Sequence, residues 1–154
     1  MNLLKRTKLN ESERVQIFEL WNNQYPIGLR YHSLEDFENY LEGLTNQSHL
    51  LVKDSLGSVI AWYFDFVREK ERWFAIIIDS KMHRKGIGQN LLERAKQKEE
   101  ELNGWVIDHD LDKKHNGENY ISPLDFYLKN GFRLLSDSRL KSDKISAVKV
   151  RWER

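Results

Sequence analysis

Hydrophobic and polar residues follow one another along the chain in a way that separates strand-like from helix-like segments. The most apolar stretch, Trp73–Ile78, has no charged residue and is rich in aromatic and β-branched side chains. That composition is typical of a strand buried on both faces of a sheet. Shorter apolar or alternating runs predict further strands over Leu3–Leu9, His49–Lys53, Ser58–Val67, Trp105–Asp108, Phe132–Leu135 and Ala147–Trp152.

Helical periodicity and helix-start signals predict three helices in the first two thirds of the chain. Asn10 can cap a helix over Glu11–Asn22, and Ser33 opens a second helix whose apolar residues recur at helical spacing. A third helix is expected over Gly86–Leu102. It should end at Asn103–Gly104, because glycine commonly follows the last turn of a helix.

A fourth helix is predicted to begin at Ser122–Pro123, with the serine as its cap, and to end at Asn130–Gly131. The polar segment Ser136–Ser146 is expected to be a loop between the last two strands. The predicted element order is β-α-α-β-β-β-α-β-α-β-β, which indicates an α/β fold with a mixed sheet. A length of 154 residues favours a single domain over residues 1–154.

Composition narrows the class of protein. The 25 basic residues nearly balance the 24 acidic ones, which argues against a nucleic-acid binder driven by bulk charge. The chain has no cysteine, which excludes disulfides, thiolate zinc sites and a thiol nucleophile. No signal peptide is visible, and no apolar run approaches the ~20 residues that span a bilayer. We therefore expect a cytoplasmic protein without a membrane partner.

The basic turn after the apolar strand has the features of an anion site. His83–Gly88 joins the strand to a helix, and backbone N–H groups at a helix N-terminus have no partner within the helix. Gly86 and Gly88 let a phosphate approach the main chain, and Arg84 and Lys85 supply positive charge. A plain strand-to-helix turn with solvated basic residues is the alternative interpretation. The sequence lacks the Gly-Lys-Ser/Thr of a Walker loop.

This stretch resembles the acyl-coenzyme A motif of the GNAT superfamily of N-acetyltransferases, V-x-P-x-x-(Q/R)-x-x-G-x-(G/A), which continues into a helix with paired leucines. Ile78 matches the valine, Gly86 and Gly88 match the two small positions, and Leu91–Leu92 match the leucines. The resemblance implies the GNAT fold, in which a mixed, mostly antiparallel central sheet carries helices on both faces. The predicted element order is the order of that fold.

Two positions depart from the pattern. Ser80 replaces the usual proline, and His83 replaces the Gln or Arg that helps to hold the coenzyme's pyrophosphate. A histidine can still donate a hydrogen bond there, more strongly when it is protonated. The resemblance implies acetyl-coenzyme A as a co-substrate, bound by Ile76, Ile77, Ile78, His83, Arg84, Lys85, Gly86, Ile87, Gly88 and Gln89.

A second segment resembles the family's aromatic-Tyr-x-x-x-Gly-Phe motif, here Phe126–Phe132. By that match Tyr127 is the candidate general acid that protonates the departing coenzyme A thiolate; the alternative is a half-buried aromatic of the core. Lys129 either reaches a coenzyme phosphate or is simply solvated. A free backbone N–H near Ile77 or Ile78 is expected to stabilise the charge that develops on the thioester oxygen.

The sequence does not assign a general base by resemblance, since spacing places the family's usual glutamate on Arg72. Asp108 and His109, at the end of the fifth strand, are the candidates, with turn capping as the alternative role of Asp108. His109 is also a candidate contact of the acceptor. The spacing of His109, His115 and the nearby acids fits no standard ligand set, so we expect no metal site.

The acceptor pocket is expected, by resemblance, between the connection of the first two helices and the last hairpin. Trp21, Tyr25 and Tyr31 in that connection can stack on a cation or pack against an apolar group. Packing of a lid is their alternative role. A small amine, a peptide amino terminus and a lysine side chain all stay open as the acceptor.

The sequence thus predicts an N-acetyltransferase that moves an acetyl group from acetyl-coenzyme A to an amine by direct attack on the thioester. The alternative is a non-catalytic acyl-coenzyme A-binding module of the same fold. A nucleic-acid binder is disfavoured because acidic residues are interleaved with the basic ones. A monomer and a homodimer are both compatible with the sequence.

Overall fold

The computed structural model describes residues 1–154 and has the predicted order of strands and helices, together with two short 3-10 turns. The fold class inferred from the sequence is confirmed. The elements are β1 (Asn2–Arg6), α1 (Glu11–Gln24), η1 (Ile27–Leu29), α2 (Leu34–Glu42), β2 (Thr45–Lys53), β3 (Val59–Arg68), β4 (Glu71–Ile78), η2 (Ser80–Met82), α3 (Ile87–Lys98), β5 (Glu101–Ile107), α4 (Leu124–Lys129), β6 (Arg133–Lys141) and β7 (Ser146–Glu153).

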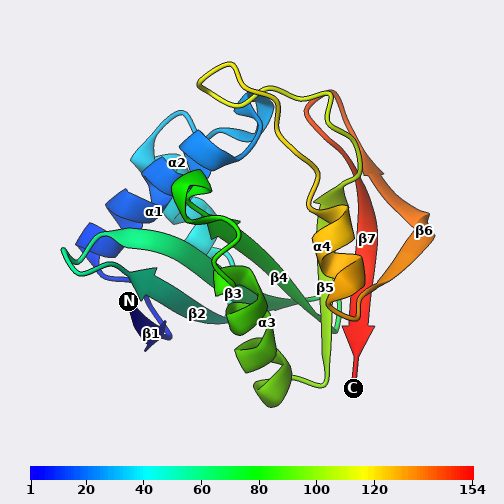
Figure 1. Cartoon of the computed structure of the whole chain (residues 1–154), viewed down its shortest axis with the longest axis horizontal. Coiled ribbons are helices and arrows are strands. Elements are labelled where there is room, and N and C mark those ends of the chain that lie inside the picture. Colours follow the sequence, from blue (N-terminus) through cyan, green and yellow to red (C-terminus); the bar gives the residue numbers. More distant parts are fainter.

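All strands belong to one seven-stranded sheet with the order β1-β2-β3-β4-β5-β7-β6. Neighbouring strands are antiparallel except β4 and β5, which are parallel and pair only through Trp73 and Asn103. Beyond that pair the two strands diverge, so the sheet splits into two halves that form a V (Figure 1). The end of β4 therefore lacks a strand partner on one side.

A charge network fastens the narrow end of the V. The Arg151 guanidinium of β7 donates to Glu71 of β4 at 3.0 Å and to Glu101 of β5 at 2.9 Å. It also donates to the Asn103 side-chain oxygen at 2.9 Å. One side chain thus links three strands where the two halves of the sheet meet.

The helices cover the two faces of the sheet. One hydrophobic cluster contains α1 and α2 residues with Trp73 and Ile77 of β4, and the other contains α3 and α4 residues with Phe74. Half-buried Ile76 and Ile78 pack against the second cluster. This alternation follows from the two-residue period of a strand. None of the helices combines the length and apolar character that a membrane crossing requires.

Two helix starts follow the predicted capping signals, whereas α4 has Pro123 and not the predicted Ser122 as its N-cap. The Asn10 side chain accepts the Glu13 N–H at 2.8 Å, and the Glu13 carboxylate accepts the Asn10 N–H at 3.0 Å, a complete capping box. The Ser33 hydroxyl accepts the Asp36 N–H at 3.1 Å and so begins α2.

The predicted end of the third helix is wrong. Helix α3 ends at Lys98, and Asn103–Gly104 lies inside β5 rather than after a helix. Leu102 is fully buried, and a Cβ on Gly104 would lie 3.0 Å from a ring carbon of Phe74. The glycine therefore permits close packing of the two strands and does not mark a helix C-terminus.

Other boundaries also differ from the prediction: β2 begins at Thr45 instead of His49, and β5 begins at Glu101 instead of Trp105. Strand β1 ends at Arg6 instead of Leu9. Most of the predicted loop Ser136–Ser146 belongs to β6, and only residues 142–145 connect it to β7. Strand β6 lies at the edge of the sheet and is largely exposed, so its sequence carries little hydrophobic alternation. Its pairing with β7 is interrupted by an irregularity between Leu135 and Arg139.

Candidate active site

A cavity of about 870 Å³ occupies the split between β4 and β5. Its lining includes Phe74, Ile76 and Ile78, which face α3 and α4, and also Trp73 and Ile77, which face α1 and α2. The cavity therefore passes through the sheet and joins its two faces. Strand β4 is not buried on both faces as predicted, because Ile76 and Ile78 are half-buried at this opening.

On the α3 side, the cavity ends at the predicted turn. Gly86 is the N-cap of α3 with φ +78°, and the first hydrogen bond of the helix runs from Asn90 N–H to the Gly86 carbonyl at 3.1 Å. The N–H groups of Ile87, Gly88 and Gln89 thus have no acceptor within the helix. All three residues line the cavity, so the positive end of the helix dipole faces it.

The basic residues of the turn differ in position. Arg84, in a left-handed conformation with φ +65°, lines the cavity, whereas Lys85 is exposed and lies outside the lining. His83 also lines the cavity, and its Nε2–H donates to the Ile78 carbonyl at 3.0 Å, since a carbonyl can only accept. That bond ties the turn to the end of β4.

The two glycines of the turn have different roles. A Cβ on Gly86 would meet nothing, but its positive φ favours glycine. A Cβ on Gly88 would lie 2.9 Å from Phe126 Cζ and 3.2 Å from Ile78 Cδ1. Gly88 therefore permits α3 to pack against α4 and β4, a reason different from the phosphate approach expected from the sequence.

The backbone of β4 presents polar groups to the split. Asp79 N–H donates to the Ile60 carbonyl of β3 at 2.9 Å, which sets the phase of the strand. Successive residues direct their N–H groups to opposite sides. The N–H group of Ile77 therefore faces β3, whereas the N–H groups of Ile76 and Ile78 face the split. Of the two amides expected near the thioester oxygen, Ile78 has the right direction and Ile77 does not.

Tyr127 of α4 lies in the cavity wall and is 7% exposed. Its ring makes edge-on contacts with Phe74, Phe126 and Phe132, and its hydroxyl has no hydrogen-bond partner within the chain. Burial raises the pKa of Tyr127 above its usual value of 10. The phenol therefore stays protonated at neutral pH and is able to donate a proton.

Besides Lys85, three of the predicted site residues lie outside the lining of this cavity. Asp108 forms a two-point ion pair with Arg139, at 2.6 and 3.2 Å. This partner lowers the pKa of Asp108, which makes it a weaker base. His109 Nδ1 accepts the Leu111 N–H at 3.1 Å, and Lys129 is exposed at the end of α4. The structure thus does not bring them together with Tyr127.

On the α1 side, the cavity is lined by aromatic rings. Trp21, Tyr25 and Tyr31 all belong to it, as expected, and the ring centroid of Trp21 lies 4.7 Å from that of Tyr25 and 5.2 Å from that of Tyr31. The Trp21 Nε1–H donates to the Leu29 carbonyl at 3.0 Å and so fixes the α1–α2 connection. The sequence analysis missed six further aromatic residues of this wall: Tyr40, Phe64, Phe66, Trp73, Trp105 and Tyr120.

The sequence near each ring could have predicted its place in the cavity wall for only some of these residues. Phe64 and Phe66 are two residues apart in β3 and therefore share a face, with ring centroids 5.7 Å apart. Trp73 and Trp105 stack at 5.2 Å across the split, from strands far apart in sequence. No pattern within either strand predicts that contact.

Several phenols share the interior of the cavity. Burial is the largest cause that raises the pKa of Tyr25. Smaller contributions come from the neighbouring phenols of Tyr120, Tyr127, Tyr40 and Tyr31. Burial also raises the pKa of Tyr40 to about 12. None of these five hydroxyls has a hydrogen-bond partner within the chain. All of them stay protonated at neutral pH and can donate to a ligand.

The long connection from β5 to α4 covers the aromatic end. Ile27 N–H donates to the Lys113 carbonyl at 2.8 Å, and Pro26 and Lys114 form an isolated bridge. In Figure 1 this connection, drawn in yellow-green and yellow, crosses from the β5–α4 side toward the blue α1–α2 connection. The bridge closes that side of the cavity.

The charged groups of the lining are mostly basic. Arg68 and Lys114 lie at the aromatic end, and the Arg68 guanidinium carbon is 4.9 Å from the centroid of Phe66. Glu118 is the single carboxylate of the lining, and its side chain is 73% exposed. No group of three or more His, Cys, Asp and Glu side chains is arranged so that it could hold a metal ion.

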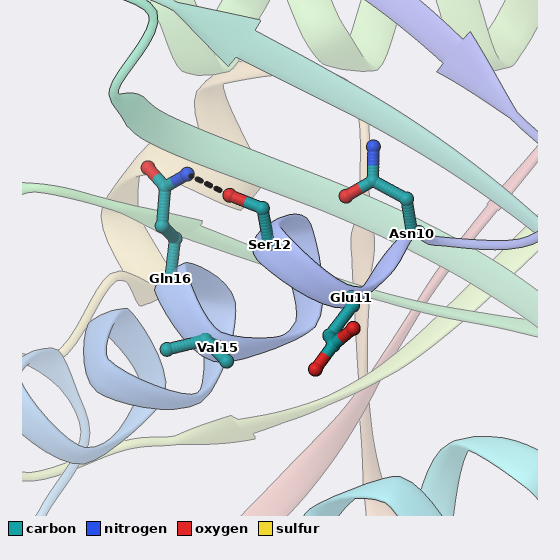
Figure 2. Close-up of a pocket in the computed structure, with 5 residues that line it drawn as sticks. All are labelled: Asn10, Glu11, Ser12, Val15 and Gln16. Atoms are coloured by element: carbon teal, nitrogen blue, oxygen red, sulfur yellow. Dashed lines mark hydrogen bonds between the residues drawn. The ribbon is translucent and has the colours of Figure 1, made fainter.

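A second hollow lies at the start of α1, lined by Asn10, Glu11, Ser12, Val15 and Gln16 (Figure 2). Apart from the Glu11 carboxylate, its polar side chains form hydrogen bonds within the chain. Asn10 caps the helix, and the Gln16 side chain donates to Ser12 at 3.2 Å and accepts the Val59 N–H at 2.8 Å. It has no connection with the residues of the main cavity, which is the better candidate for chemistry.

Comparison with known proteins agrees with this geometry. Residues 46–134 match the model of the acetyltransferase (GNAT) domain. A search of curated proteins finds no match. Among solved structures, the chain resembles an aminoglycoside 6'-N-acetyltransferase complexed with coenzyme A, with 12% identity, a TM-score of 0.74, and 99% of this chain and 97% of that chain covered.

Two further similar structures have named sources. An acyl-CoA N-acyltransferase from Pseudomonas aeruginosa has 16% identity and a TM-score of 0.70, with 99% of both chains covered. A spermidine N-acetyltransferase from Vibrio cholerae has 16% identity and a TM-score of 0.68, with 99% of this chain and 95% of that chain covered. These likenesses show a shared fold over nearly the full length. The match over residues 46–134 establishes that the chain belongs to the GNAT acetyltransferase family.

Proposed function

We propose that this protein transfers the acetyl group of acetyl-coenzyme A to an amine nitrogen. The observation that carries the proposal is the single cavity through the β4–β5 split. It connects the unpaired amides of α3 to an aromatic chamber on the opposite face, with Tyr127 in its wall. Two substrates can therefore enter from opposite faces and meet in the split. The family supports this proposal, and similar proteins named for acetylation of aminoglycosides and spermidine support an amine acceptor.

The residues around the turn fit the coenzyme. The N–H groups of residues 87–89 and the Arg84 guanidinium suit its diphosphate, because both oppose negative charge. The outward N–H groups of Ile76 and Ile78 suit the amide-containing arm, since β5 has moved away from this edge of β4. Of the predicted coenzyme contacts, Lys85 and Lys129 lie outside the cavity lining, and we do not assign them a role.

Tyr127 serves as the general acid in this proposal. When the coenzyme is bound, a neutral amine attacks the thioester carbon, a C–N bond forms, the C–S bond breaks, and the sulfur takes a proton. The raised pKa of Tyr127 keeps its phenol protonated at neutral pH. A protonated phenol beside the departing sulfur can supply the proton that the thiolate takes. The Ile78 N–H faces the split and is placed to stabilise charge on the thioester oxygen. The nitrogen loses its proton as the amide product forms.

The lining of the cavity contains no buried carboxylate or imidazole that could act as a base. Asp108 is held by Arg139, and Glu118 is largely exposed. We therefore propose that the amine arrives neutral, or is deprotonated through water, and that catalysis depends mainly on holding the two reactants together. The same absence of a side-chain base is the observation that favours the second candidate function, a non-catalytic module that binds acyl-coenzyme A.

Release of free thiol from acetyl-coenzyme A separates these two functions. The purified chain is incubated with acetyl-coenzyme A and a panel of amines: spermidine, an aminoglycoside, a lysine derivative and α-amino compounds. A transferase releases thiol only when a suitable amine is present. A binding module shows a thermal shift with coenzyme A but no amine-dependent release. If coenzyme A causes no thermal shift and no amine releases thiol, both functions are contradicted.

A further inference from the structure

The aromatic end of the cavity has a composition that selects among amines. Its rings form a wall that extends over α1, α2, the connection between them, the strands β3, β4 and β5, and the β5–α4 connection. The wall contains Trp21, Tyr25, Tyr31, Tyr40, Phe64, Phe66, Trp73, Trp105 and Tyr120. Apolar rings stabilise a ligand by burial of its own apolar surface. A ligand with a bulky apolar side chain gains most from this wall.

The charges at this end oppose a polycation. Arg68 and Lys114 line it, and the one carboxylate, Glu118, is 73% exposed and lies 4.0 Å from the Lys114 ammonium. A polyamine or an aminoglycoside carries several ammonium groups, and each of them loses hydration on entry without meeting a buried anion. The same two cations attract a ligand that carries a carbonyl or carboxylate oxygen.

Hydrogen-bond donors are plentiful in the same space. The hydroxyls of Tyr25, Tyr31, Tyr40 and Tyr120 have no partner within the chain, and each of these residues lines the cavity. A protonated phenol donates readily to an oxygen acceptor. The wall thus offers donors for an oxygen, positive charge at its rim, and apolar surface for a side chain.

Resting on the proposed function, we propose that the acceptor is an α-amino carbonyl compound with an aromatic or other bulky apolar side chain. Its amine is attached to the same carbon as the apolar group and the carbonyl group. A free amino acid, an amino acid amide and the amino terminus of a peptide all share this chemistry. Polyamines and aminoglycosides do not.

The acidity of the amine is consistent with this class. A peptide α-amino group has a pKa of about 7.7–8.0, whereas a lysine-type amine has one of about 10.4. At pH 7.5, roughly a third of the former and about 0.1% of the latter is neutral and able to attack. In a cavity without a buried base, the neutral fraction of an α-amino group is therefore hundreds of times larger than that of a lysine-type amine.

The test compares matched acceptors by thiol release with saturating acetyl-coenzyme A. We expect kcat/KM for L-phenylalanine amide to exceed that for spermidine, an aminoglycoside and glycine amide by at least tenfold. Glycine amide has the same amine and carbonyl but no side chain, so it isolates the contribution of the aromatic wall. Comparison of L-phenylalanine with the dipeptide Phe-Ala shows whether a free amino acid or a peptide amino terminus is the preferred acceptor.

Arg68 provides a variant that tests the charge at the rim. Arg68→Gln should lower kcat/KM at least fivefold for L-phenylalanine, which has a carboxylate, and should change it less than twofold for L-phenylalanine amide. Lys70→Gln is the matched control, since Lys70 is exposed, basic and outside the cavity lining. Equal effects of Arg68→Gln on both acceptors would contradict a role of Arg68 in holding the carboxylate.

Calorimetry of the same compounds, with the protein saturated with coenzyme A, separates this inference from the proposed function. If L-phenylalanine amide binds more tightly than spermidine but no amine releases thiol, the acceptor class stands and the transferase function fails. If spermidine or the aminoglycoside is preferred, the function stands and the acceptor class is overturned. If L-phenylalanine amide neither binds nor reacts, the acceptor class is overturned as well.

Discussion

The ring of Phe126 lies so close to the backbone of Gly88 that a Cβ added there would be 2.9 Å from its Cζ atom. This contact joins the first turn of α3 to the middle of α4. The helix that presents the unpaired amides and the helix that carries Tyr127 are therefore held against each other by the absence of a side chain.

Gly88→Ala should destabilise the fold by about 1–3 kcal/mol, because the added methyl group overpacks a contact between buried elements. Urea denaturation measures the effect. Gly43→Ala is the control, since a Cβ there meets atoms only at 3.6 Å and its φ is −77°. A Gly88→Ala protein as stable as the parent would show that α4 is free to shift.

Tyr127→Phe should leave coenzyme A binding within about twofold and should lower kcat about 100-fold or more, the usual effect of removing a general acid. Calorimetry measures binding, and thiol release measures turnover. The ring contacts with Phe74 and Phe132 are retained in the variant, so a folding defect is not expected. Full turnover by Tyr127→Phe would remove this residue from the mechanism.

Arg84→Gln should raise the Kd of coenzyme A roughly fivefold, equivalent to about 1 kcal/mol for one exposed charge pair. The effect should shrink as salt is added, because exposed charges are screened. Lys85→Gln should change the Kd less than twofold, since Lys85 lies outside the cavity lining. Equal losses in the two variants would indicate a diffuse electrostatic effect rather than a direct contact.

His49 should make the protein acid-sensitive. It is fully buried between Trp62 and Phe64, accepts the Trp62 Nε1–H at 3.0 Å, and burial lowers its pKa to about 4. The unfolded chain, with a histidine pKa of about 6.5, binds the proton first as pH falls. Above about pH 6.5, His49 is neutral in both the folded and the unfolded chain, so it does not make the free energy of unfolding depend on pH. Between about pH 6.5 and 4, the free energy of unfolding should fall by roughly 2 kcal/mol or more.

Nuclear magnetic resonance of the imidazole measures this titration directly, and urea denaturation at several pH values measures its effect on the free energy of unfolding. His32→Gln serves as the control, since His32 is exposed. That variant should keep the pH dependence of the parent. A His49 that titrates near 6.5 in the folded protein would contradict the buried, neutral state.

Much of the fold can be predicted because its signals are local. Asn10 and Ser33 reveal helix starts within four residues, and the two motifs around Gly86 and Tyr127 specify the family. The part of strand β6 beyond Leu135 escapes prediction because an exposed edge strand needs no apolar face. That residues 1–154 form a single domain, and that the protein is a monomer or a homodimer in the cytoplasm, remain predictions.

The candidate site is predicted less well, because a sequence places a residue in an element but does not give the direction of its side chain. Asp108 follows β5 as expected, yet its carboxylate pairs with Arg139, which the sequence places in a loop. Arg84 and Lys85 are neighbours with the same charge, and only the first lines the cavity. The aromatic wall is built from two helices, three strands and two connections, so no single stretch reveals it.

The linkage of Arg151 to Glu71, Glu101 and Asn103 has a consequence for the geometry of the reaction. These groups lie at the narrow end of the V, where the pair Trp73 and Asn103 joins the two halves of the sheet. A small change in the angle at a vertex becomes a larger displacement at the open end. The width of the gap in which two reactants must meet is therefore governed by charged side chains that touch neither of them.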